Sequence, residues 1–175
     1  LLIPPLKIVE GGVTNEAIFD LILRNTRYPD VLGNDLHAQL ASLQTSADEL
    51  GSIFTRYGRE TIIDCAEAIM AHGEKRTRQE IEAIADGVYQ HEEPILDDGA
   101  KGGPYWLRVG ITKRGSEICF DFTGTDEQIA GPINAPLSTT LSAVDYVMRC
   151  LTDPTLPNSD GCKRPIQVVA PPGTL

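Results

Sequence analysis

The sequence lacks the features that would place it in a membrane or on a nucleic acid. No apolar run approaches the roughly 20 residues that a membrane-spanning helix needs. Positive charge is scarce, because 15 Lys and Arg residues face 25 Asp and Glu residues and leave a net charge of −10. A surface this acidic repels phosphate backbones. We therefore expect neither a membrane nor a nucleic acid among its partners.

Cysteines are few and scattered. Cys65, Cys119, Cys150 and Cys162 include no Cys-x-x-Cys pair. They could form two disulfides, but a globular chain of 175 residues can bury about 70% of its unfolded surface and does not need cross-links to hold a core. Reduced thiols and a cytoplasmic location are therefore predicted.

No complete catalytic signature occurs. The sequence has no Gly-x-Ser-x-Gly elbow, no His-Glu-x-x-His pair and no Cys/His cluster of the zinc type. His37, His72 and His91 are far apart, and none has a partner at ligand spacing on one helical face. We therefore predict no metal ligand in this chain. The glycines at 99–103 precede a predicted strand rather than a helix, which favours a turn over a phosphate-binding loop.

Apolar residues at helical spacing dominate the first half of the chain. A short helix is predicted over Asn15–Leu23. From Leu36 to Tyr57, apolar residues recur at spacings of four and three, which predicts a long helix that Gly58 ends. A further helical segment runs from about residue 60 to 85, with Gly73 as a candidate break. The short link at Gly58 predicts that the two long segments form an antiparallel helical hairpin.

The pattern changes to period two after residue 87. Strands are predicted at 88–96, 105–112 and 117–122, and the last two form a hairpin. Pro94 cannot donate a ladder hydrogen bond, so the first strand is expected at a sheet edge. A helix over 137–151 and a final strand over 166–170 complete the pattern. Helices first and mostly antiparallel strands later indicate an α+β fold.

The strongest candidate site follows the predicted hairpin. Asp121 falls on the polar face at the end of its strand, and Thr123 and Gly124 come next. Asn134 lies further along, in the loop that leads to the helix at 137–151. Carboxylate, hydroxyl, amide and free backbone groups gathered on one loop are typical of a binding site. The alternative is a structured turn in which Asp and Asn bond the neighbouring main chain.

Asp35 and Gln39 form a second, weaker candidate pair. They are four residues apart near the start of the long helix, so both can point into one cleft. The alternative is that the aspartate complements the helix dipole and the glutamine is solvated.

Several separated motifs resemble the hydantoinase B/oxoprolinase family. The resemblance is carried by Asp-Phe-Thr-Gly-Thr at 121–125 and Gly-Pro-Ile-Asn-Ala-Pro at 131–136. It extends in order along essentially the whole chain, through 3–10, 25–29, 33–39, 148–151, 161–165 and 172–175. Several motifs at compatible spacing make the resemblance specific.

The resemblance implies part of an ATP-dependent enzyme. Relatives open cyclic amides such as hydantoins and 5-oxoproline, or carboxylate ketones, and their B-type subunit works with an A-type subunit or domain that handles ATP. The family's metal-type motif has no counterpart here, so ATP and a divalent metal are implied for the full enzyme and no cofactor for this chain. We therefore interpret 1–175 as one central fragment of a larger B-type subunit, mainly helical over 1–87 and rich in strands over 88–175, and inactive alone.

The family context suggests roles for the candidate residues. Asp121 would orient a substrate N–H, and Thr123 with the Gly124 amide would hold an oxyanion or phosphoryl oxygen. Asn134 is a further candidate for the chemistry, and Asp35 and Gln39 for substrate binding. A non-catalytic subunit-interaction module, in which the apolar helical stripe contacts the partner, and part of a ketone carboxylase remain as alternatives.

Overall fold

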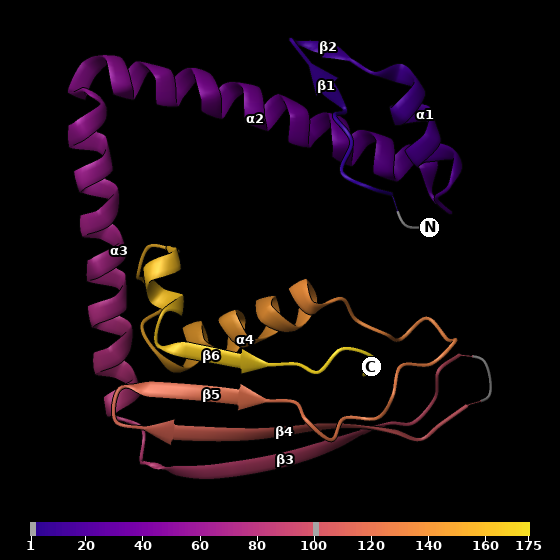
Figure 1. Ribbon diagram of the computed structural model, residues 1–175, viewed down its shortest axis with the longest axis vertical. Coiled ribbons are helices and arrows are strands. Elements are labelled where there is room, and N and C mark those ends of the chain that lie inside the picture. Colours follow the sequence, from indigo (N-terminus) through magenta and orange to yellow (C-terminus); the bar gives the residue numbers. More distant parts are fainter. Residues whose placement is uncertain (1–2, 100–101) are drawn as a thin grey trace. The chain divides into compact units, whose positions relative to one another are not determined.

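The computed structural model describes residues 3–99 and 102–175 and divides into two compact units, Leu1–Ile62 and Ile63–Leu175. Helices and a mostly antiparallel sheet are both present, so the predicted α+β class is confirmed (Figure 1). None of the helices in the described ranges combines the length and the apolar character that crossing a membrane requires.

The first unit is a small ribbon followed by two helices. Strands β1 (Val9–Glu10) and β2 (Val13–Thr14) pair antiparallel, and α1 (Glu16–Arg24) follows within one residue of the prediction. The Asn15 side chain caps α1 by accepting a hydrogen bond from the Ile18 amide at 3.3 Å. Helix α1 packs on α2 through the buried Phe19, whose ring centroid lies 4.8 Å from that of His37.

Helix α2 (Pro29–Tyr57) begins seven residues before the apolar stripe that predicts it. Proline is compatible with the first helical turn, where its missing N–H has no partner to lose. The helix ends at Gly58, whose φ of 79° few other residues adopt, as predicted. The antiparallel packing of the two long helical segments stays a prediction.

Helix α3 (Arg59–Glu82) runs without a break, so the candidate interruption at Gly73 is wrong. The glycine serves packing instead. A Cβ at Gly73 would lie 2.8 Å from both Cys162 Sγ and Ser159 Oγ, at the 3-10 turn η1 (Asp160–Lys163). Gly161 in that turn packs against the main chain of Met70, again with no room for a Cβ. Two glycines therefore let the turn lie directly on the helix.

The second unit is built on a four-stranded sheet in the order β3-β4-β5-β6. Strands β3 (Gly87–Ile95), β4 (Tyr105–Arg114) and β5 (Glu117–Asp121) are antiparallel neighbours, while β6 (Ile166–Val169) pairs parallel with β5. The predicted hairpin and the edge position of the Pro94 strand are both confirmed.

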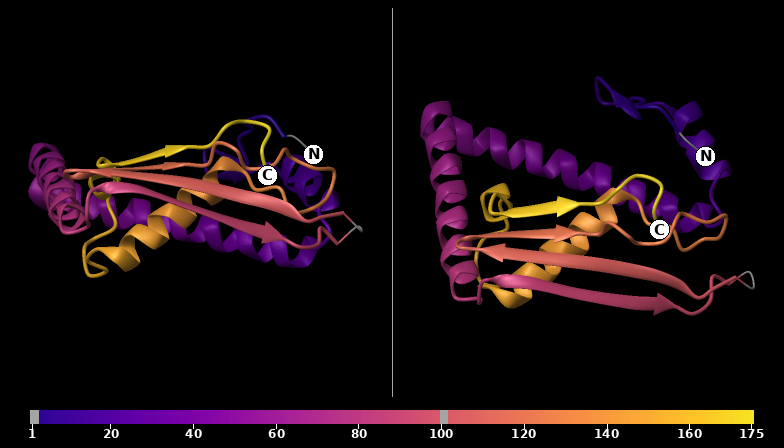
Figure 2. Two further views of the ribbon diagram at one scale, coloured as in Figure 1. Left: turned by 90° about the horizontal axis from the view of Figure 1, so that it is seen from below. Right: turned by 60° about the horizontal axis from the view of Figure 1, so that its bottom comes forward.

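One face of the sheet carries the core. Helix α4 (Leu137–Leu151) lies across this face (Figure 2). Alternation along β5 turns Ile118 and Phe120 toward the helix, while Cys119 and Asp121 take the other face. The buried apolar cluster combines residues of α3, β5 and α4, namely Ile81, Ile118, Phe120, Val144 and Met148.

A buried lysine ties the start of the sheet together. Lys113 on β4 is 3% exposed, and its Nζ lies 2.7 Å from Asp86 Oδ1 in the loop between α3 and β3. The same oxygen accepts the Gly115 amide at 3.0 Å. The hydrogen bond from Lys113, with a smaller contribution from Gly115, lowers the pKa of Asp86. The loop is thus held by an ion pair whose cation is buried.

We expect Asp86→Asn to lower the melting temperature at neutral pH, because the buried ammonium of Lys113 loses its charged partner. A lowered folded-state pKa contributes stability above the ordinary aspartate pKa, and this contribution disappears as the pH falls through the folded value. The difference in melting temperature between the wild type and Asp86→Asn should therefore be constant near neutral pH and become smaller in acid.

Fluorescence of Trp106, the sole tryptophan, follows unfolding of this unit. Glu82→Gln, at the exposed end of α3, is the matched control and should change little. A melting temperature that Asp86→Asn leaves unchanged at every pH would contradict the assignment.

Candidate functional site

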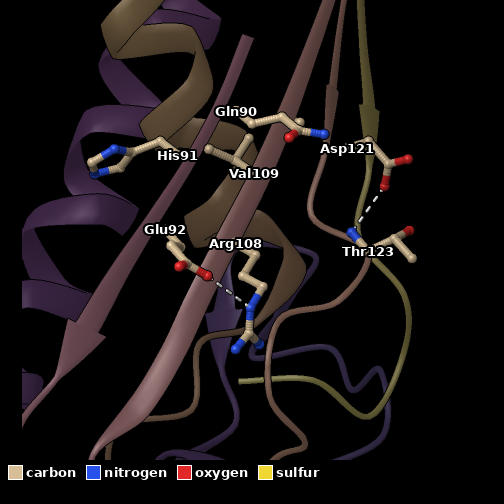
Figure 3. Close-up of a pocket in the computed structure, with 8 residues that line it drawn as sticks. Gln90, His91, Glu92, Arg108, Val109, Asp121 and Thr123 are labelled. Atoms are coloured by element: carbon tan, nitrogen blue, oxygen red, sulfur yellow. Dashed lines mark hydrogen bonds and ion pairs between the residues drawn. The ribbon is translucent and has the colours of Figure 1, made fainter. Parts of the chain in front are cut away.

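A hollow of about 670 Å³ lies over β3, β4 and β5 (Figure 3). Gln90, Gly110 and Asp121 are direct neighbours across these three strands. They belong to the face of the sheet opposite the Ile111 and Phe120 core positions, because side chains alternate along a strand. The lining residues are Gln90, His91, Glu92, Arg108, Val109, Gly110, Asp121 and Thr123.

Gly110 supplies space at the centre of the hollow. It has no side chain, and a Cβ built there would come no closer than 3.9 Å to another atom, the Asp121 carbonyl oxygen. The polar groups of Gln90 on one side and Asp121 on the other therefore flank an open stretch of main chain. The space for a small molecule therefore depends on Gly110. In the sequence, this glycine occupies an ordinary position in a predicted strand, and nothing marks it as part of a site.

Asp121 presents a carboxylate to this hollow. Its Oδ1 accepts the Thr123 amide at 2.9 Å, which turns the chain at the end of β5. Hydrogen bonds from the Thr123 side chain and amide lower the pKa of Asp121, so the group is ionised at neutral pH. In Figure 3 its second oxygen points away from Thr123, where it can accept a hydrogen bond from a ligand.

Arg108 links the strands to the loop after β5. Its Nη1 donates to Asp126 Oδ1 at 2.8 Å and to the Gly124 carbonyl at 2.5 Å, and its Nε lies 3.3 Å from Glu92 Oε2. The hydrogen bond to Arg108 is the main cause that lowers the pKa of Asp126, followed by the bond from the Trp106 amide. The loop that carries Thr123 and Gly124 is therefore anchored by a charged side chain of β4.

Thr125 adds a second anchor to the same loop. The residue is buried, and its hydroxyl both accepts the Arg108 amide at 3.0 Å and donates to the Arg108 carbonyl at 3.0 Å. The Thr125 hydroxyl thereby satisfies the N–H and the C=O of Arg108, which a neighbouring strand would otherwise bond. The loop is fixed by bonds on both sides of Gly124, so its backbone is held in place before any ligand binds.

Asn134 lies in the loop before α4, as its sequence position predicts, and its side chain bonds to that loop. Its amide accepts the Ile129 N–H at 2.9 Å and donates to the carbonyls of Ile129 at 2.6 Å and Gly131 at 3.2 Å. The side chain thus closes a turn in the loop before α4 and does not line the hollow. These hydrogen bonds match the alternative of a structured turn, and the role of Asn134 in the chemistry stays a prediction.

The other predicted residues are divided between two places. Thr123 lines the hollow with Asp121. Gly124 follows it, and the Gly124 carbonyl oxygen accepts a hydrogen bond from Arg108. Asp35 and Gln39 belong to the first unit, where both are exposed on α2 and Gln39 lines a separate shallow hollow with its helical neighbours. Their role in substrate binding stays a prediction.

No group of three or more His, Cys, Asp or Glu side chains within residues 3–99 and 102–175 is arranged to hold a metal ion. His37 packs on Phe19, and His91 pairs with Glu93 at 3.4 Å, with its ring turned away from Asp121 in Figure 3. The described side chains therefore do not fit the divalent metal that the family resemblance implies for the full enzyme.

Sequence reasoning missed Arg108 and Asp126, and it interpreted Glu92 only as part of an acidic pair with Glu93. Arg108 stands on the polar face of an alternating strand, where a charged residue is ordinary. Its partners lie 16 and 18 residues away on both sides of the chain, so their pairing depends on strand register. The alternation of apolar and polar residues could have indicated that Arg108 lies near Asp121, since both residues are on the polar face of the predicted hairpin.

Comparison with known proteins identifies a family for this chain. A family model described as hydantoinase B/oxoprolinase matches residues 1–175. A protein assigned as the B-type component of a D-/L-hydantoinase in Pseudomonas sp. (strain NS671) is 34% identical over 97% of this chain, and the 5-oxoprolinase of Saccharomyces cerevisiae is 30% identical over 97%. The chain spans 31% and 14% of the lengths of these two relatives.

Solved structures share the fold. The ATP-dependent caprolactamase from Pseudomonas jessenii superposes with a TM-score of 0.86 and 25% identity, over 100% of this chain and 30% of its own. A nucleotide-free acetone carboxylase superposes with a TM-score of 0.77 at 16% identity, over 97% of this chain and 24% of its own, which shows the fold alone. With the family model matching from end to end, the chain belongs to the hydantoinase B/oxoprolinase family.

Proposed function

We propose that the chain is part of a B-type subunit that opens cyclic amides in an ATP-dependent reaction with an A-type partner. The family match over residues 1–175 carries this proposal. The likeness to a caprolactamase described as ATP-dependent supports it, because that relative acts on a lactam and includes the whole of this fold. The chain spans less than a third of the relatives' length, so the activity is proposed for the intact subunit.

In this proposal the hollow on the sheet binds the ring. The ionised carboxylate of Asp121 accepts the N–H of the amide and so orients it. The Gly124 amide donates toward the carbonyl oxygen as it gains negative charge, and the Thr123 hydroxyl adds a second donor when it turns from Asp121 to this oxygen. Arg108, Thr125 and Asp126 hold the loop that carries these donors.

ATP and a divalent metal would act outside the described residues. ATP supplies the energy of ring opening when it is bound, and the family resemblance gives it to the A-type partner. The net charge of −10 supports this assignment, because a strongly acidic chain does not favour binding of a triphosphate. A cytoplasmic location is part of the proposal.

The test uses the intact subunit purified with its A-type partner. Hydantoin, 5-oxoproline and caprolactam are supplied with ATP, and ring-opened product and ADP are measured together. Formation of an open-chain product that depends on both ATP and the partner supports the proposal. ATP turnover with a ketone and bicarbonate, and with none of the cyclic amides, would replace it by the ketone carboxylase alternative.

A non-catalytic interaction module is the second candidate. Large apolar side chains of α2 are exposed within the first unit, including Leu43 at 67% and Leu50 at 48%. Exposed apolar side chains on one helix are typical of a subunit contact. Substitution of the polar residues Asp121 and Thr123 tests this candidate. It is favoured if the variants still bind the partner subunit and if turnover by the complex is unchanged.

A further inference from the structure

The hollow has an excess of negative charge. Glu92 and Asp121 line it, and Asp126 lies directly behind Arg108. The carboxylates of Glu92 and Asp126 both pair with one guanidinium, that of Arg108, and the Asp121 carboxylate adds a third negative charge. Within the described residues that line the hollow, Arg108 is the only Lys or Arg side chain.

The positive charge of this guanidinium already faces protein acceptors through its Nε and Nη1 atoms. Its Nε lies 3.3 Å from Glu92, and its Nη1 contacts both Asp126 at 2.8 Å and the Gly124 carbonyl. A ligand carboxylate that approached Arg108 would compete with two protein carboxylates and one carbonyl oxygen. Arg108 is therefore poorly placed to neutralise an anionic ligand.

Asp121 extends the negative charge across the hollow. It stands on β5, beside Gly110, and its hydrogen-bonding partner Thr123 carries no charge. Among the described residues that line the hollow, no Lys or Arg side chain forms an ion pair with it. A ring with an N–H group can donate to this carboxylate, whereas a ring with its own carboxylate is repelled by it.

We infer that this site selects neutral cyclic amides, which present an N–H to Asp121, and discriminates against rings that carry a carboxylate. The inference rests on the proposed function and narrows its substrate class. Hydantoin and caprolactam belong to the favoured class, and 5-oxoproline, an anion at neutral pH, belongs to the disfavoured one.

The charge of Glu92 provides the test. Glu92→Gln removes one negative charge beside the hollow and frees part of Arg108, while the side chain keeps its size. At a separation of several ångströms near a solvated surface, one unit charge alters the relative binding of an anion by about three- to tenfold. We expect kcat/KM for 5-oxoproline, divided by that for hydantoin, to rise by this factor in the intact subunit with its partner.

Glu93→Gln is the matched control. Glu93 is the next residue on the same strand, carries the same charge and is exposed, but alternation points it to the other face. It pairs there with the ring of His91, which adjoins the hollow but is turned away from Asp121 in Figure 3. Both variants change the net charge by the same amount, so only a local effect separates them. The substrate ratio of the control should equal that of the wild type.

The possible results separate this inference from the proposed function. A wild type that prefers 5-oxoproline to hydantoin, or a ratio that Glu92→Gln leaves unchanged, overturns the inference although ring opening stands. If no ring is opened, calorimetric titration of the same proteins with hydantoin and 5-oxoproline gives the ratio of Kd values. Tighter binding of hydantoin, with a ratio that shifts in Glu92→Gln alone, then supports the inference without the proposed activity.

Discussion

Replacing Asp121 with Asn in the intact subunit is expected to lower kcat/KM for ring opening by about 10- to 100-fold. This factor corresponds to the loss of a hydrogen bond to a charged group in a positioned site. Asparagine keeps the size of the side chain and an oxygen that can accept the Thr123 amide, so the turn at the end of β5 should persist. What is lost is the negative charge and the second acceptor facing the hollow.

The measurement is steady-state kinetics of the variant and its partner with hydantoin or caprolactam. Asp160→Asn is a suitable control, because its carboxylate is 88% exposed on η1 and pairs only weakly with Lys163 at 3.7 Å. Since the pKa of Asp121 is lowered, acidification to the ordinary aspartate pKa should not abolish its contribution. Unchanged turnover in a folded Asp121→Asn protein would remove Asp121 from the site and leave the hollow as a surface feature.

Elements with a strong local pattern could be predicted from the sequence. The hairpin of β4 and β5 follows from alternating apolar residues on both sides of a short polar turn. The edge position of β3 follows from Pro94, which cannot serve a strand on both sides. The same alternation places Asp121 on the outer face, and the hollow lies on that face. Local chemistry was sufficient in each case.

The contacts that build the site could not be predicted in this way. Arg108 meets Glu92, Gly124 and Asp126 only because β3 and β4 pair in one register and the loop after β5 returns beside them. A shift of β4 by one residue would turn Arg108 to the other face, away from these partners. Asn134 shows the opposite case, since an amide between two turn-forming Gly-Pro and Ala-Pro segments has enough local partners to be used up.

The packing role of Gly73 cannot be read from the sequence. Gly73 in a helical pattern predicts a weak point, because glycine lowers helix stability by about 1 kcal/mol relative to alanine. The structure gives it another role that depends on a segment 86 residues later, as Gly161 and its turn lie against α3. Sequence periodicity within α3 carries no information about that contact.

Replacing Gly161 with Ala is expected to lower the free energy of unfolding of the second unit by about 3 kcal/mol. The added Cβ would overlap the Met70 carbonyl group of α3. Backbone cannot rotate away as a side chain can, so the turn η1 or the helix must shift as a whole. Urea unfolding followed by the fluorescence of Trp106 measures the change.

A graded set of glycines distinguishes backbone overlap from a general effect of added methyl groups. At Gly73 the Cβ would meet only the side-chain ends of Cys162 and Ser159, at 2.8 Å, so Gly73→Ala should cost less, and its gain in helix propensity offsets part of that cost. At Gly87 the Cβ would make ordinary contact with the Tyr89 ring at 3.6 Å, and Gly87→Ala should change stability by about 0.5 kcal/mol at most. The order of destabilisation should be Gly161, Gly73, Gly87. Equal effects at all three would mean that η1 does not lie on α3, and the loops that leave this turn would then have no fixed support beside β6.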